Sequence, residues 1–244
     1  MLDPTSLAFW IAVLQIIAID ILLGGDNAVV IALACRKLPD SQRKQGIFWG
    51  VAGAIGLRVI LIFFALQLLD IPWLKIAGAL LLVWIGIKLL QPEDEGHGDV
   101  AAATSLAGAI KTIIVADAVM SLDNVIAVAA AAHGSMLLVV LGILVSIPIV
   151  VWGSQLVLKL MDRYPIVITG GGALLGWIGG GMIVTDPALP PGLAEAIPAP
   201  KYVLATAGAV LVVAIGKWLA LRTERERLAA RKAPVDLLEE TRRN

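Results

Sequence analysis

Long apolar stretches alternate with short polar breaks along most of the chain. A helix needs roughly 20 mostly apolar residues to cross the hydrocarbon core of a bilayer. Seven stretches fit this requirement, at residues 7–34, 46–69, 72–90, 106–132, 136–160, 165–185 and 201–221. The breaks between them are rich in charge, proline or glycine, which is typical of loops. The pattern predicts an all-α membrane protein with seven transmembrane helices.

The composition agrees with this prediction. Of the 244 residues, 59% are hydrophobic and 16% are charged, and the mean hydropathy is +0.91, whereas a soluble domain carries about 25% charged residues. Nineteen basic and nineteen acidic residues cancel, so no excess charge favours a nucleic-acid partner. The single cysteine and two histidines argue against a disulfide, a thiolate metal cage or a His-rich zinc centre. The start of the chain has no basic region before its apolar run, so we expect no cleavable signal peptide.

Basic residues gather in three regions: the segment 36–44, the turn after the fifth stretch, and the end of the chain from residue 222. With seven spans, all three lie on one side of the membrane if the amino terminus is outside. The positive-inside rule then places the carboxyl terminus in the cytoplasm. We therefore expect a multi-pass protein of the cell membrane, with a transmembrane domain at 1–222 and a cytoplasmic basic tail at 223–244.

Two segments of the chain resemble each other. Residues 16–31 read IIAIDILLGGDNAVVI, residues 113–128 read IIVADAVMSLDNVIAV, and both contain D-x5-D-N at a separation of 97 residues. A second match, between residues 72–86 and 165–179, has a separation of 93 residues. Each half would hold three spans, so the second half must enter the membrane inverted. The sequence predicts two inverted three-helix repeats, at about 7–90 and 106–185, plus a seventh helix at about 201–221.

The repeated motif places four carboxylates inside predicted spans. An ionisable side chain at the bilayer centre costs about 2.5–3.5 kcal/mol on insertion scales, and its presence indicates a functional site. Ligand sets made only of oxygen suit Mn²⁺, Mg²⁺ or Ca²⁺ better than Cu⁺ or Zn²⁺. We predict one shared site near the midplane, formed by Asp20, Asp26, Asn27, Asp117, Asp123 and Asn124.

Glycines and one arginine lead to further expectations. Residues six positions apart on a regular helix point about 240° apart, so we expect the first helix to unwind at Gly24 and Gly25. The glycine-rich segment 170–181 favours close helix packing. Arg58 lies well inside a predicted span and is expected to pair with an aspartate of the motifs, and its counterpart in the second half falls near Gln155.

The segments 20–34 and 117–132, in a seven-span chain of this length, resemble the TerC family of integral membrane proteins, especially its short YjbE-type members. The resemblance covers roughly residues 7–221. It implies Mn²⁺ efflux, although the family takes its name from tellurite resistance, and distant kinship with the lysine-exporter superfamily. It also implies that the Asp and Asn residues of the two motifs handle the metal.

The leading hypothesis is a non-enzymatic exporter of divalent cations, with Mn²⁺ as the first candidate substrate and protons as a candidate counter-ion. The alternatives are an exporter of a small organic solute and a non-transporting scaffold linked to metal or tellurite resistance. An intramembrane aspartyl protease is disfavoured, because the G-x-G-D signature of that chemistry would need glycine at Leu23. We expect the lipid bilayer and the metal ion as partners, no resident cofactor, and self-association as an open alternative. Asp186, in a predicted outer loop, is expected to be neutral to transport.

Overall fold

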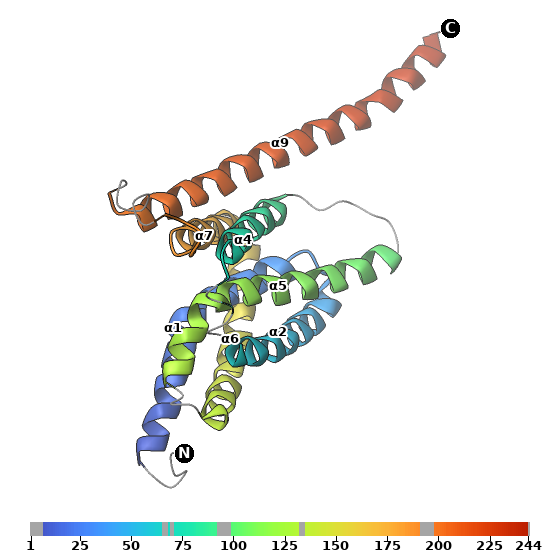
Figure 1. Ribbon diagram of the computed structural model, residues 1–244. Helices are drawn as coiled ribbons and strands as arrows, with labels where there is room; N and C mark the ends of the chain where they lie inside the picture. The colour runs from blue at the N-terminus through green and yellow to red at the C-terminus, as the bar shows by residue number, and fades with distance from the viewer. Residues whose placement is uncertain are drawn as a thin grey trace.

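The computed structural model describes residues 7–64, 68, 71–91, 99–131, 135–190 and 198–243, and regular secondary structure in these ranges is entirely helical (Figure 1). The all-α prediction is confirmed at this level. The helices are α1 (Leu7–Cys35), α2 (Asp40–Phe63), α4 (Leu74–Leu90), α5 (Asp99–Ala131), α6 (Met136–Arg163), α7 (Ile166–Ile183) and α9 (Pro200–Arg243).

Several of these helices are apolar enough to cross a membrane. Among the described residues, α2, α7, residues 137–163 of α6 and residues 200–226 of α9 have the length and composition of membrane spans. The helix α4 is shorter, at 17 residues. The seven-span count stays a prediction.

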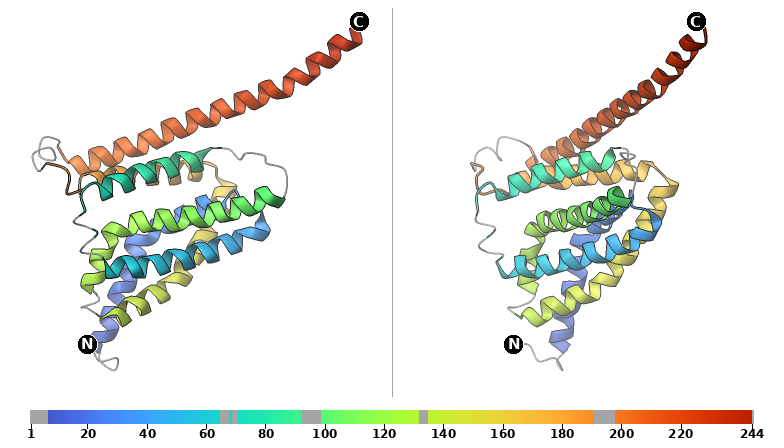
Figure 2. Two further views of the ribbon diagram at one scale, coloured as in Figure 1. Left: turned by 45° about the vertical axis from the view of Figure 1, so that its right-hand side comes forward. Right: turned by 90° about the vertical axis from the view of Figure 1, so that its right-hand side faces the viewer.

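Helices that are distant in the sequence pack in pairs (Figure 2). α1 lies along α6, α2 lies along α5, and the two motif-bearing helices α1 and α5 contact each other. α4, α7 and α9 form a second group in which α7 packs against both α4 and α9. Each motif-bearing helix therefore packs against several others, and among the described motif side chains Asn27 and Asp117 are buried.

α7 and α9 approach so closely that only glycine fits between them. A Cβ atom at Gly180 would lie 2.0 Å from the carbonyl oxygen of Leu204, and one at Gly176 would lie 2.3 Å from that of Gly208. Both distances are far below a van der Waals contact. The prediction that the glycine-rich segment supports close helix packing is confirmed.

The expected break in the first helix is absent. α1 runs from Leu7 to Cys35 and is helical through Gly24 and Gly25. In a bilayer, each backbone N–H and C=O must find a partner within the protein, and a continuous helix provides these partners within one segment. The prediction of unwinding at this position was therefore wrong: glycine permits unwinding but does not require it.

The predicted tail continues the last helix. α9 spans 44 residues and has no break at residue 222. Its carboxyl-terminal part projects beyond the other helices (Figure 1). The backbone thus extends the seventh predicted span directly into residues 223–243.

Asp186 holds the start of α4 from the segment that follows α7. Its carboxylate accepts hydrogen bonds from the backbone N–H groups of Trp73 at 2.9 Å, Ile76 at 3.1 Å and Ala188 at 2.7 Å. The bonds from Trp73 and Ile76 satisfy N–H groups that a helix start leaves without intrahelical partners, and Trp73 adopts a left-handed φ of 70° there. Asp186 is only 4% exposed and thus has a structural role, whereas its expected neutrality to transport stays a prediction.

Candidate metal-binding site

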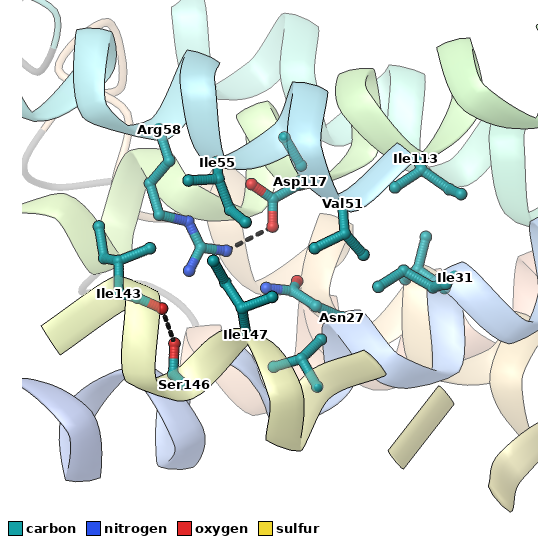
Figure 3. Close-up of a pocket in the computed structure, with 13 residues that line it drawn as sticks. Asn27, Ile31, Val51, Ile55, Arg58, Ile113, Asp117, Ile143, Ser146 and Ile147 are labelled. Carbon is teal, nitrogen blue, oxygen red and sulfur yellow. Dashed lines mark hydrogen bonds and ion pairs between the residues drawn. The ribbon is translucent and has the colours of Figure 1, made fainter. Parts of the chain in front are cut away.

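Arg58 of α2 forms a buried ion pair with Asp117 of α5 (Figure 3). A terminal guanidinium nitrogen donates to Asp117 Oδ1, and Arg58 Nε donates to Ser121 Oγ at 3.1 Å. The Ser121 hydroxyl donates to Asp117 Oδ2 at 3.3 Å. The exposed fractions are 9% for Arg58, 7% for Asp117 and 1% for Ser121. Buried charges persist when they are paired and hydrogen-bonded, and this network meets both conditions.

The ion pair borders a small cavity between α1, α2, α5 and α6 (Figure 3). The cavity measures about 30 Å³ and has a mostly aliphatic lining, to which Asn27, Arg58, Asp117 and Ser146 add polar groups. The hydroxyl of Ser146 donates to the carbonyl of Ile143 at 2.8 Å. A space of this size admits water-sized species.

Two oxygens of the first motif are buried without a hydrogen-bond partner. They are Asp26 Oδ1 and Asn27 Oδ1. Asn27 is 5% exposed and lines the small cavity. Buried polar atoms are nearly always hydrogen-bonded, because an unmet one costs about 1–3 kcal/mol. Both oxygens are therefore candidate ligands for a species from outside the polypeptide.

Asp26 belongs to a second, larger cavity between α1, α5, α7 and α9. This cavity measures about 330 Å³, and its lining joins Asp26 of the first motif to Asn124 of the second. The remaining lining residues are Met120, Trp177, Ile178, Gly181, Met182, Lys201, Tyr202 and Ala205. Each cavity thus combines a residue of the first motif, on α1, with a residue of the second motif, on α5.

Comparison with known proteins identifies the family. The profile of the integral membrane protein TerC family matches residues 5–227. The chain belongs to the TerC family. The membrane protein YjbE of Bacillus subtilis (strain 168) is 48% identical over 179 residues, which cover 73% of this chain and 81% of YjbE. The inner membrane protein YgdQ of Escherichia coli (strain K12) is 26% identical over 183 residues, which cover 68% of this chain and 75% of YgdQ. No solved structure matches the chain.

In this TerC-family protein, the predicted site residues divide between the two cavities. Asn27 and Asp117 line the small cavity, and Asp26 and Asn124 line the large one. The side chains of Asp20 and Asp123 lie outside the described part of the chain. Among the described side chains, no three His, Cys, Asp or Glu residues come close enough to hold a metal ion. The single six-residue site stays a prediction.

The small cavity has a lining that repeats between α2 and α6. Four pairs of lining residues share a separation of 92 positions, namely Val51 with Ile143, Ala54 with Ser146, Ile55 with Ile147, and Arg58 with Val150. By this correspondence, Val150 of α6 is the counterpart of Arg58 of α2. Gln155, the expected counterpart, is exposed. Corresponding residues are 97 positions apart in the motifs but 92 apart in these helices. An offset of 97 from Arg58 leads to Gln155, whereas an offset of 92 leads to Val150.

Sequence reasoning missed Ser121 as a member of the network around Asp117. Residues four positions apart lie on the same face of a helix, so the spacing of Asp117 and Ser121 on α5 would have indicated the contact. It also did not identify which aspartate pairs with Arg58; among the described side chains, Asp117 does. No local pattern connects two residues on different helices, so this choice needs the tertiary structure.

Proposed function

We propose that this TerC-family protein exports divalent metal cations, with Mn²⁺ as the first candidate, through a site built on its two Asp-Asn motifs. The observation that carries the proposal is the pair of unpartnered buried oxygens, Asp26 Oδ1 and Asn27 Oδ1. Carboxylate and amide oxygens are ligands of hard divalent ions. An arriving ion would supply the partner that both oxygens lack.

The charge balance also supports a cation. Arg58 pairs with Asp117, whereas the described structure gives no ion pair to Asp26. A carboxylate held in a membrane without a counter-charge either takes up a proton or binds a cation. Exchange of protons for the metal follows from this balance and is part of the proposal.

The cavity volumes bear on the organic-solute alternative. The small cavity, at about 30 Å³, excludes an organic solute, whereas the large one, at about 330 Å³, falls in the range of small-molecule pockets. Trp177 and Tyr202 at the large cavity would suit an organic cation beside Asp26. This second candidate is separated from the first by its substrate in a flux assay.

Helix contacts support the proposed inverted repeat. In such a repeat, α1 corresponds to α5 and α2 corresponds to α6. The contact between α1 and α6 then corresponds to the contact between α5 and α2, and both contacts are extensive. A Cβ atom at Gly50 of α2 would meet Ile113 at 2.5 Å, and one at Gly142 of α6 would meet Ile16 at 2.3 Å. Ile16 and Ile113 share the 97-residue separation of the motifs, so the same contact recurs in each half.

Contacts at the two ends of the bundle support the proposed orientation. Arg43 at the start of α2 pairs with Asp162 at the end of α6 at 3.1 Å, so the basic segments 36–44 and 159–163 lie at one end. Asp186, which follows α7, accepts hydrogen bonds from the start of α4, so the segments after α7 and before α4 lie at the same end of the bundle. With the basic end in the cytoplasm, the cell membrane and an external amino terminus follow as part of the proposal.

The test is Mn²⁺ flux into proteoliposomes that contain purified protein, with Asp26→Asn and Asp123→Asn as the key variants. We expect both variants to insert and to lose flux, because a neutral amide cannot offset the dehydration of a divalent ion as a carboxylate does. Asp20→Asn and Asp117→Asn should weaken flux severely. Asp40→Asn is the matched control, because the Asp40 side chain is 91% exposed.

Three outcomes would contradict the proposal. Wild-type flux in both key variants would mean that the carboxylates do not form the ion path. Absence of ion flux in the wild type would favour the scaffold. Flux of a small organic amine without flux of Mn²⁺ would favour the organic-solute exporter.

A further inference from the structure

Two methionines line the large cavity. Met120 of α5 and Met182 of α7 line it together with Asp26 and Asn124. The chain has five methionines, so two of the five border one cavity. Both are deeply buried, with exposed fractions of 5% for Met120 and 3% for Met182.

The two side chains can present sulfur to the cavity and still pack against the core. Methionine has three rotatable bonds and a polarisable thioether, so it adapts to irregular space. The terminal methyl of Met182 would lie 3.7 Å from a Cβ atom at Gly78 of α4. Met182 therefore extends toward α4, and the same residue lines the cavity.

The same cavity is lined by the residue whose carboxylate has an unpartnered oxygen. Asp26 contributes to its lining, and Asp26 Oδ1 is buried without a hydrogen bond. Asn124 of the second motif also lines the cavity. At about 30 Å³ for each water, the volume of about 330 Å³ holds roughly ten waters. A divalent ion can enter with most of its hydration shell and exchange some of these waters for protein ligands.

We propose that Met120 and Met182 offer thioether sulfur to the ion held at Asp26 and Asn124, and that they thereby select transition-metal ions over Ca²⁺ and Mg²⁺. The inference rests on the proposed export of divalent metals and adds a basis for discrimination. Ca²⁺ and Mg²⁺ take oxygen ligands, whereas thioether ligands favour softer ions. A site made only of oxygen would bind Ca²⁺ and Mn²⁺ through similar contacts.

The test compares Met120→Leu, Met182→Leu and the double variant with the wild type. Leucine is close to methionine in volume, so the exchange removes sulfur at small structural cost. Met161→Leu is the matched control, because Met161 is 1% exposed and lines neither cavity. Binding of Cd²⁺, Mn²⁺ and Ca²⁺ to the purified full chain is measured by calorimetry, and Mn²⁺ flux is measured with Ca²⁺ as competitor.

We expect Cd²⁺, the softest probe, to lose affinity by about tenfold or more in the double variant, a loss in the range seen when a metal site loses a supporting partner. Mn²⁺ should lose less, Ca²⁺ should be unchanged, and Ca²⁺ should therefore compete better with Mn²⁺ flux. Equal affinities for all three ions in the double variant and the wild type would overturn the inference. Equal losses in Met161→Leu would assign the effect to packing and would overturn it as well.

A second measurement needs no variant. X-ray absorption spectroscopy of the Cd²⁺-loaded wild type should contain a cadmium–sulfur scattering shell, and a shell of oxygen alone would overturn the inference. Failure of the wild type to bind or move any divalent ion would instead refute the proposed function. Mn²⁺ flux that is unaffected by both leucine substitutions would leave metal export standing and reject only the role of sulfur.

Discussion

The Arg58–Asp117 pair predicts a large and non-additive effect on stability. Replacing Arg58 by Met keeps an apolar stem but leaves Asp117 as a buried carboxylate without its guanidinium. Breaking a buried ion pair by removing one partner costs about 3–5 kcal/mol, whereas replacing both charges is far less costly. We therefore expect Arg58→Met and Asp117→Asn each to destabilise the protein by about 3 kcal/mol, and the double variant to recover most of that loss.

The measurement is thermal unfolding of the purified protein in mild detergent, followed by the fluorescence of its seven tryptophans. For a chain of 150–250 residues, 1 kcal/mol shifts Tm by about 2–4 °C, so each single variant should melt about 6–12 °C below the wild type. The control is the exposed pair Arg222–Glu226, whose side chains are 62% and 65% exposed. Arg222→Met should cost under about 1 kcal/mol.

The decisive quantity is the coupling free energy from the double-mutant cycle. A closed network should give a coupling of several kcal/mol. Additive single effects, with a coupling below about 0.5 kcal/mol, would refute the argument that the two charges neutralise each other inside the bundle. That result would leave Arg58 available for a role in ion movement.

Two further predictions concern packing and the segment after α7. Gly180→Ala should destabilise the protein by about 1–3 kcal/mol in the same unfolding assay, because the new methyl would meet the carbonyl of Leu204. The control Gly170→Ala should leave the stability unchanged, because its Cβ would meet nothing within 4 Å. Equal effects of the two substitutions would contradict the close contact. Asp186→Asn should cost about 1–2 kcal/mol: burial raises the pKa of Asp186, but hydrogen bonds from Ala188, Trp73 and other backbone N–H groups outweigh burial and lower its pKa below 3.8. The stability that this carboxylate contributes is therefore present above about pH 4 and lost on acidification below it, and the variant should show a flatter pH dependence of Tm there; an unchanged slope would contradict the role.

The helices were largely predictable, because apolar length is a local property. The predicted first span ends one residue from Cys35, and the predicted third span ends at Leu90, as α4 does. The second helix differs: α2 begins at Asp40, six residues before the apolar stretch. Hydropathy marks where a helix enters the bilayer, whereas a polar turn after Pro39 continues the same helix into water.

The candidate site was predictable in composition but not in its connections. The D-x5-D-N repeat identified residues that line both cavities. The pairing of Arg58 with Asp117 and that of Asp186 with Trp73 join residues 59 and 113 positions apart. Such contacts depend on how helices pack, and several aspartates were equally suitable partners. The same limit explains why the sequence did not indicate the contact of Asp186 with the start of α4.

The helices α2 and α6 differ in charge within the small cavity that both of them line. The lining residues of α2 and α6 correspond at four positions, yet one pair joins Arg58 to Val150. A valine cannot neutralise a carboxylate, and among the described side chains of the two motifs the buried ion pair is the one at Asp117. The first motif keeps Asp26 Oδ1 and Asn27 Oδ1 without partners. Asp117 ties α2 to α5, and under the proposed function Asp26 is the carboxylate that receives the cation. The proposed ion site is therefore centred on Asp26 rather than divided equally between the two motifs.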